Sequence, residues 1–494
     1  MRRRARIALA LAAALAVAAS PLAAQVWAGG RLRIVAPNPE DVEFGRAVAV
    51  LDFDGDGDLE IAIGDPSTDK VEDAPLPAVR LYHRTGAGWE EWISARIGAV
   101  WFGTVLAVGD FNEDDRQDLL IGAPGDSNGG GAVYWWHKTD SDSSFGSVLT
   151  TLGAADGGCG SSLAVGDFDG DDHLDFATGC PRASFDDYDA VGRVEIAYGD
   201  GDGTFSTGTF FHQASADVEG SPETGDEFGA ALAAGDFRCD GVDDLAVGAP
   251  GEDVDGGTDT GAVHVLPGSD TGLTGTDSQL WHQGTTGVPG ASGDGDRFGA
   301  ALAAGDFDRG LAGPYCEALA IGVPDDAGNP GGAVVVLHES DTGLTAAGAK
   351  LFTVASFGPP SNPGADHHFG FSLAAGQIDG DDDEELVVGA RGDVGFPTAL
   401  AGSACVLYGT PEGPSGEGAI CFAGSSNEFV EGALPDGDRE FGTALAIGPL
   451  DGEDGAELVL GSPGFREVFV LESALFADGF ELGSTGRWSF AFDD

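Results

Sequence analysis

A seven-fold internal repeat constrains the fold of this chain more than any other feature of its sequence. The clearest copy reads Phe228-Gly-Ala-Ala-Leu-Ala-Ala-Gly-Asp236 and continues as Asp244-Leu-Ala-Val-Gly-Ala-Pro250. Six copies open with Phe-Gly, and the remaining copy opens with Cys159-Gly160. The copies begin near residues 44, 102, 159, 228, 298, 369 and 441, so they are separated by 57 to 72 residues. One repeated supersecondary unit therefore accounts for most of the chain.

Each unit contains short apolar runs bounded by Gly, Pro and Asp, which is typical of β-strands, and no run has a helical period. Four strands per unit in seven units predict an all-β fold, a seven-bladed β-propeller over residues 30–472. The seventh unit lacks a fourth strand. The segment Arg31-Leu-Arg-Ile-Val-Ala36 precedes the first Phe-Gly just as fourth strands precede the others. We expect this N-terminal strand to complete the last blade and to close the ring.

An acidic loop of nine residues joins the first two strands of each unit. The first loop reads Asp52-Phe-Asp-Gly-Asp-Gly-Asp-Leu-Glu60, with side-chain oxygens at loop positions 1, 3, 5 and 9. Ca²⁺ takes six to eight oxygen ligands, and the backbone carbonyl at position 7 supplies another. The predicted ligands are Asp52, Asp54, Asp56, Asp58 and Glu60 in loop 1, Asp110, Asn112, Asp114, Arg116 and Asp118 in loop 2, and Asp167, Asp169, Asp171, His173 and Asp175 in loop 3. Asp58, Arg116 and His173 are the position-7 residues.

The other four loops depart from this pattern. Loop 4 keeps Asp236, Asp240 and Asp244 but places Arg238 at position 3, where it weakens the site or replaces the ion with its own charge. Loop 5 has Asp306 and Asp308 and then an insertion before Glu317. Loop 6 begins with Gln377, followed by Asp379, Asp381 and Glu385. Loop 7 begins with Pro449 and is the most altered. We therefore expect three to five calcium ions rather than seven.

Two other interpretations of the loops fit the sequence less well. A solvated acidic turn without an ion explains one such loop, but less well several copies in the same position between strands. An EF-hand needs flanking helices and a bidentate Glu at position 12, whereas these loops have strands on both sides.

These residues resemble the FG-GAP repeat of integrin α-subunit head domains and of many bacterial surface proteins. The name FG-GAP describes two short motifs, which here are Phe228-Gly229 before an acidic loop and Gly248-Ala249-Pro250 after it. The resemblance implies a seven-bladed propeller with calcium in hairpin loops on one face and ligand contacts on the other. It implies much less about function, because FG-GAP propellers serve in adhesion, in glycan binding and as modules attached to enzymes.

Both ends of the chain and its cysteines suggest export. Arginines and an Ala-rich apolar run in residues 1–24 predict a secretory signal peptide, and residues 473–494 form a tail that is either a sorting segment or an edge strand. Six cysteines in an exported chain predict disulfides. Their spacing suggests the pairs Cys159–Cys180, Cys405–Cys421 and Cys239–Cys316. We therefore expect a secreted or cell-surface protein with no transmembrane segment in the mature chain.

The charge balance limits the partners. The chain has 83 Asp plus Glu against 23 Lys plus Arg, a formal net charge of −60, which disfavours nucleic acid and anionic lipid. We expect a monomeric, non-enzymatic calcium-binding scaffold that recognises a protein or glycan ligand. The alternative is a hydrolase or polysaccharide lyase with its site on one face of the propeller.

Overall fold

The computed structural model describes residues 31–38, 41, 43–66, 76–86, 88–126, 129–139, 143–148, 157–308, 316–357, 367–381, 383–392, 402–423, 440–450 and 456–471. The predicted signal peptide and the C-terminal tail lie outside these residues. Within them, the chain forms seven four-stranded antiparallel sheets. The described residues include two short 3₁₀ turns, η2 (Val354–Phe357) and η3 (Pro463–Phe465).

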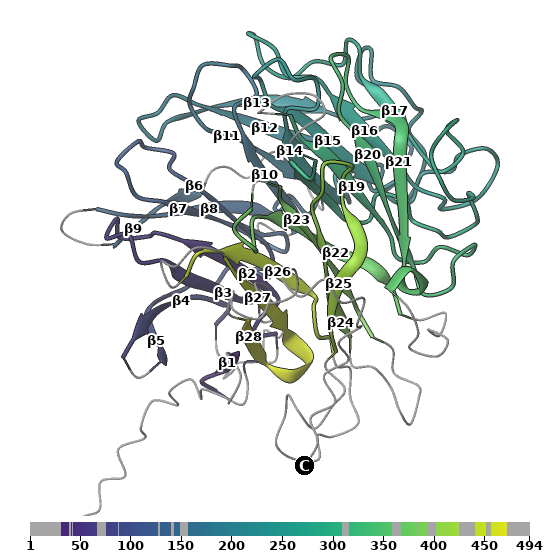
Figure 1. Cartoon of the computed structure of the whole chain (residues 1–494). Coiled ribbons are helices and arrows are strands. Elements are labelled where there is room, and N and C mark those ends of the chain that lie inside the picture. The colour runs from purple at the N-terminus through teal and green to yellow at the C-terminus, as the bar shows by residue number, and fades with distance from the viewer. Residues whose placement is uncertain are drawn as a thin grey trace, which may run out of the picture.

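The strands follow one order in every sheet. Figure 1 shows the sheets following one another in chain order around the molecule. The first strands are β2 (Ala47–Leu51), β6 (Leu106–Gly109), β10 (Ser162–Gly166), β14 (Ala231–Gly235), β18 (Leu302–Gly305), β22 (Phe369–Gly376) and β26 (Ala444–Gly448). The second strands are β3 (Glu60–Asp65), β7 (Asp118–Ala123), β11 (Asp175–Gly179), β15 (Asp244–Ala249), β19 (Ala318–Val323), β23 (Glu385–Ala390) and β27 (Glu457–Ser462). The third strands are β4 (Ala78–Thr85), β8 (Ala132–Lys138), β12 (Val194–Gly199), β16 (Ala262–Leu266), β20 (Ala333–His338), β24 (Ser403–Tyr408) and β28 (Glu467–Leu471). The fourth strands are β5 (Gly88–Arg96), β9 (Ser143–Val148), β13 (Phe205–Phe211), β17 (Gln279–Trp281), β21 (Thr345–Thr353), β25 (Ser415–Ala423) and β1 (Arg31–Val35).

The sheets are the blades of a seven-bladed β-propeller, as the repeat predicted. Each first strand contacts the first strand of the next blade, and β26 contacts β2. The predicted closure is confirmed, because β1 pairs with β28 and completes the sheet β1-β28-β27-β26. An N-terminal strand thus joins a C-terminal blade, and this leaves no first or last blade with an open side.

The apolar core lies between neighbouring blades. The phenylalanines of the Phe-Gly openings are almost fully buried, as are those at position 2 of loops 1 to 5. Between blades 1 and 2, for example, Phe53 and Leu81 pack in one cluster with Phe102, Leu119 and Trp136. Contacts of this kind require each blade to have a neighbour on both sides, so a single repeat would not bury its apolar residues alone.

The two glycine motifs of the repeat meet across the blade boundary. Gly103, in the Phe-Gly opening of blade 2, has a φ of +88° and donates its N–H to Gly122 O at 3.0 Å. Its own carbonyl approaches Gly64 in the second strand of blade 1, where an added Cβ would lie 2.2 Å from Gly103 O. Only glycine allows so close an approach and the positive φ. The Phe-Gly and Gly-Ala-Pro ends are therefore parts of one inter-blade contact.

Candidate metal centres

The acidic loops lie at the hairpins between first and second strands. The position-9 residue is the first residue of the second strand and pairs with the last residue of the first strand, as in Leu51↔Glu60 and Gly166↔Asp175. This register places the position-9 side chain at the base of the hairpin. Positions 1 to 8 form the turn that joins the two strands.

The position-1 carboxylate organises the turn. In loop 3, Asp167 Oδ1 accepts N–H groups from Gly170 at 2.7 Å and Asp171 at 3.1 Å, and Oδ2 accepts from Asp172 at 2.9 Å. Asp52 accepts three equivalent N–H groups in loop 1, and Asp110 accepts two in loop 2. The side chain takes the place of a backbone acceptor, as in Asx turns. The shape of the loop therefore comes from the protein itself.

The position-9 carboxylate is buried and accepts the position-2 N–H. Phe53 N donates to Glu60 Oε2 at 3.0 Å, and Phe168 N donates to Asp175 Oδ2 at 2.9 Å. Burial first, and then the neighbouring loop carboxylates, raise the pKa of Glu60 to about 8 and that of Asp175 to about 7. The same causes raise the pKa of Asp118 to about 7 and that of Glu385 to about 8. A buried carboxylate with a raised pKa is stabilised by a nearby cation.

The position-3 carboxylates of loops 1 and 3 give the strongest indication that these loops bind an ion. In loops 1 and 3, Asp54 Oδ1 and Asp169 Oδ1 are buried, and neither has a hydrogen-bond partner in the described part of the chain. Burial and the adjacent carboxylates raise the pKa of both aspartates. Buried polar oxygens normally have a partner, so these two point to one that protein atoms do not supply.

Three loops bring candidate ligand atoms within 4.8 Å of one another. The groups are Asp52, Asp54 and Glu60; Asp167, Asp169 and Asp175; and Asp379, Asp381 and Glu385. Each group is a set of carboxylate oxygens, which suits a hard cation such as Ca²⁺. The residues present therefore fit the ion that the sequence pattern predicts. In loop 6 the amide of Gln377 replaces the position-1 carboxylate and accepts the Gly380 N–H at 2.8 Å.

Positions 5 and 7 lie farther out. Asp56 and Asp58 in loop 1, Asp114 in loop 2 and Asp171 in loop 3 are exposed. The position-5 carboxylate accepts the position-7 N–H, with Asp58 N to Asp56 Oδ1 at 2.9 Å and His173 N to Asp171 Oδ1 at 3.0 Å. Part of each predicted ligand set is thus engaged in forming the turn.

The side chains of Arg116 and His173 connect neighbouring loops, which sequence reasoning missed. Arg116 Nε donates to Asp54 O at 3.3 Å in loop 1, and its guanidinium lies 3.4 Å from Asp114. His173 Nδ1 lies 2.5 Å from Glu113 Oε1 in loop 2. Loop 2 itself has Asn112 at position 3, whose Oδ1 accepts the Asp114 N–H at 3.1 Å.

Loop 4 holds its own cation. Arg238 at position 3 donates from Nε to Asp244 Oδ1 at 2.9 Å and from Nη2 to Gly268 O at 2.5 Å, and it lies 3.0 Å from Asp240 Oδ2. Asp236 still accepts the Asp240 and Gly241 N–H groups. The turn is therefore retained while a guanidinium lies among the carboxylates.

In loops 2, 4, 5 and 6, the residue at position 8 ties the loop to the loop before it. Gln117 donates its N–H to Asp52 O at 2.8 Å and accepts the Asp52 N–H on Oε1 at 2.8 Å. Asp243, Glu317 and Glu384 accept the position-1 N–H groups of Asp167, Asp236 and Asp306 in the same way. No sequence signal within one repeat indicates this contact, because it joins two blades.

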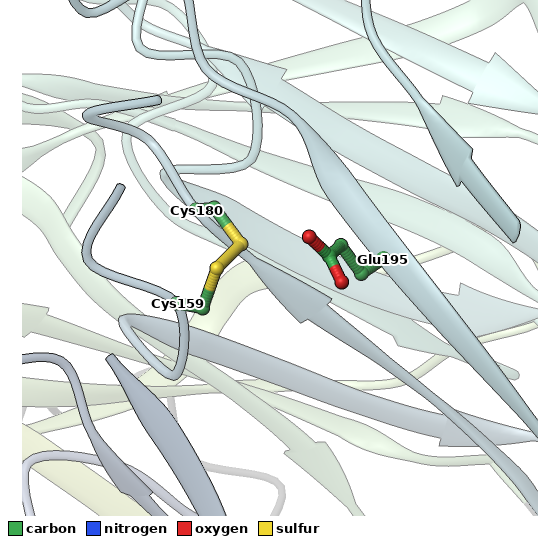
Figure 2. A group of neighbouring side chains, drawn as sticks. All are labelled: Cys159, Cys180 and Glu195. Carbon is green, nitrogen blue, oxygen red and sulfur yellow. A yellow bond between two sulfur atoms is a disulfide. The ribbon is translucent and has the colours of Figure 1, made fainter. Parts of the chain in front are cut away.

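Three disulfides join Cys159 to Cys180, Cys239 to Cys316 and Cys405 to Cys421, the pairs that the spacing suggested. Figure 2 shows the first of them beside Glu195. These three side chains also lie close enough to hold a metal, but the two sulfurs are bonded to each other and Glu195 pairs with Arg193. This group is therefore a structural crosslink.

Comparison with known proteins agrees with this geometry. A model of the FG-GAP repeat matches residues 44–75, 102–134 and 228–266. The chain contains FG-GAP repeats. It is 30% identical over 241 residues to integrin alpha-PS2 of Drosophila melanogaster and 31% identical over 194 residues to integrin alpha-V of Gallus gallus. It is also 38% identical over 114 residues to phosphatidylinositol-glycan-specific phospholipase D of Homo sapiens.

These matches cover 47%, 38% and 23% of this chain and 15%, 17% and 14% of the respective relatives. The FG-GAP propeller thus corresponds to a small part of much longer proteins, and its blades are similar to the N-terminal propeller of integrin α subunits. The described residues contain no helix that could span a membrane.

Proposed function

We propose that this FG-GAP propeller is an exported, calcium-binding scaffold that acts in adhesion or ligand recognition without catalysing a reaction. The observation that carries the calcium proposal is the convergence of carboxylates in loops 1, 3 and 6, with Asp54 Oδ1 and Asp169 Oδ1 buried and unpartnered in the described structure. Carboxylates at these distances repel one another strongly when no cation lies between them.

Calcium in these loops would hold the hairpins together. Asp167 and Asp169 would bind from the turn and Asp175 from the base of the strand. Extracellular calcium modules have dissociation constants on the order of 10⁻⁴ to 10⁻³ M, and we expect the same range here. Export is supported by the predicted signal peptide and by the three disulfides, because disulfides persist in oxidising compartments.

The recognition role is supported by the similarity to integrin α subunits and by the scaffold itself. A rigid ring of blades presents many loops at fixed positions, and a chain of formal net charge −60 favours cationic protein patches over nucleic acid. Because the matches cover a small part of each relative, the ligand is proposed only by class, as a protein or a glycan.

The test has two parts. Thermal unfolding should occur at a markedly lower temperature in EGTA than in millimolar Ca²⁺, and an unchanged melting temperature would defeat the calcium proposal. A binding screen against glycans and surface proteins, with and without Ca²⁺, should then detect a ligand. A calcium-stabilised protein that binds no member of either class would reject the recognition role alone.

The alternative of a hydrolase is kept because one relative is a phospholipase D. The matched region is only 14% of that relative, so the similarity does not carry the activity over. Turnover of a phosphodiester or polysaccharide substrate by the purified chain would favour this alternative.

A further inference from the structure

Loop 5 has lost the calcium pattern. Ala318 is the first residue of β19 and pairs with Gly305, so it occupies position 9 and offers no carboxylate. Glu317, the nearest acidic residue, turns away and accepts the Asp236 N–H in loop 4 at 2.7 Å. Asp308 at position 3 is therefore left without the base carboxylate that loops 1, 3 and 6 possess.

Asp308 instead meets the end of the third strand. His338 is the last residue of β20, and its Nδ1 lies 3.0 Å from Asp308 Oδ2. Glu339 follows directly, and one candidate ligand atom from each of these three residues lies within 4.8 Å of the other two. The exposed fractions are 3% for Asp308, 8% for His338 and 7% for Glu339. This cluster is more deeply buried than those of the calcium-type loops.

One atom of the cluster has no partner. Glu339 Oε2 is buried and makes no hydrogen bond within the described structure, although its side chain belongs to a group with a second carboxylate. The nearby ammonium of Lys350 donates to Pro414 O at 3.0 Å, and no ion pair joins it to either carboxylate among the described residues. A buried carboxylate oxygen beside another carboxylate needs a positive partner.

We propose that Asp308, His338 and Glu339 form a site for a divalent transition-metal ion of the Zn²⁺ class, distinct in chemistry from the calcium loops. An imidazole nitrogen with two carboxylate oxygens suits Zn²⁺, whereas Ca²⁺ prefers oxygen ligands only. Ligands about 2.1 Å from a tetrahedral ion lie about 3.4 Å apart, which is near the observed Nδ1–Oδ2 separation. The ion would replace the proton between His338 and Asp308, and that proton would pass to solvent.

The site also has support from the neighbouring blade. Gly413 lies beside His338, where an added Cβ would be 2.8 Å from its Cε1, and Gly348 lies near its other ring edge. Backbone thus lies close to the imidazole on two sides and limits its orientation. A ligand whose orientation is already fixed loses little entropy when it binds a metal.

The experiment is a Zn²⁺ titration by calorimetry in saturating Ca²⁺, so that the acidic loops do not compete. The intact protein should bind one Zn²⁺ tightly, and His338→Gln and Glu339→Gln should each weaken this binding at least about tenfold. His368→Gln is the matched control, because His368 Nδ1 lies 2.7 Å from Asp325 in a more exposed pair without a third carboxylate. Its Zn²⁺ binding should equal that of the intact protein.

Co²⁺ absorption in the visible range gives a second measurement on the same proteins, since a tetrahedral site with nitrogen and oxygen ligands has intense bands. If His338→Gln fails to fold, Glu339→Gln keeps the volume of the side chain and decides the matter. A protein that takes up no Zn²⁺, or variants that bind it as tightly as the intact protein, would overturn the proposal. So would loss of binding in His368→Gln alone.

Discussion

Loops 3 and 4 have the same turn but different charges at its centre. In both loops, the position-1 aspartate accepts the N–H groups of positions 5 and 6. In loop 3, Asp169 Oδ1 is buried and unpartnered, whereas in loop 4 the guanidinium of Arg238 contacts Asp240 and Asp244. The turn is therefore built by the backbone and position 1. Position 3 decides whether the loop needs a cation from solution or supplies its own.

The largest expected effect is on the pH dependence of stability, because it involves several loops at once. Without a cation, burial raises the pKa of Glu60 and Glu385 to about 8 and of Asp175 to about 7, above the values of the unfolded chain. The folded state then holds more protons than the unfolded state between about pH 5 and 8. The free energy of unfolding in EGTA should therefore rise as pH falls through this window.

In saturating Ca²⁺ the same carboxylates are ionised, so acidification should weaken metal binding and lower stability. Denaturant unfolding at pH 8, 7, 6 and 5 with and without Ca²⁺ measures both slopes. Equal slopes under the two conditions would show that the loop carboxylates do not respond to calcium.

The next largest effect is expected from Arg238→Asp, which converts loop 4 to the pattern of loop 3. In EGTA the change should cost about 3 kcal/mol, because Asp244 is fully buried and loses its ion-pair partner. In Ca²⁺ at 100 times the dissociation constant, binding at the new site should restore about 2.7 kcal/mol. Arg238→Met is the matched control and should lose stability equally in both buffers. A variant that Ca²⁺ does not rescue would contradict the comparison.

Asp169→Ala should have a slightly smaller effect, confined to the calcium form. Removal of this ligand should abolish up to about 2.7 kcal/mol of calcium-linked stability at the same saturation. In EGTA the variant should be as stable as the parent protein or more so, since a buried unpartnered oxygen is gone. Asp187→Ala, which removes an exposed carboxylate outside the loops, serves as the charge control. Equal losses in both buffers would indicate a purely structural role for Asp169.

The smallest effects separate loop 2 from loop 7. Asp110→Ala should cost about 1 to 2 kcal/mol, because the Asp115 N–H loses its acceptor and the Asp114 N–H keeps only Asn112 Oδ1. Pro449 occupies the equivalent position in loop 7 and is exposed, so Pro449→Ala should change stability by less than about 0.5 kcal/mol. Chemical unfolding curves of the two variants provide the test, and the opposite ranking would mean that loop 7 is the more structured turn.

The repeat allowed the fold to be predicted because it is a local pattern. Phe-Gly openings, strand-length apolar runs and nine-residue acidic loops all lie within one unit. The closure of the ring could also be predicted, because the segment from Arg31 precedes the first Phe-Gly just as fourth strands precede the others. β1 pairs with β28 as expected. Gly64 and Gly103 belong to the repeated motif, but the sequence does not predict their contact across two blades.

The parts of the site that could not be predicted depend on packing between distant residues. His338 lies 30 residues after Asp308, and no local spacing relates them. Gln117 contacts Asp52 across 65 residues because adjacent blades bring their loops together. The sequence identifies Arg238 as an exception to the loop pattern. Its hydrogen bond to Gly268 O depends on the fold, which brings the residues after the third strand next to loop 4. Side-chain contacts within one hairpin can be predicted from the sequence, whereas contacts between hairpins can be found only from the folded structure.

The most direct test of the account is the number of Ca²⁺ ions bound per chain, measured by equilibrium dialysis for the parent protein and for Arg238→Asp. The account predicts three or four ions for the parent, in loops 1, 3 and 6 and in loop 2, and one more for the variant, since Arg238 at position 3 excludes an ion from loop 4. A parent protein that binds no Ca²⁺, or a variant that binds the same number as the parent, would contradict it.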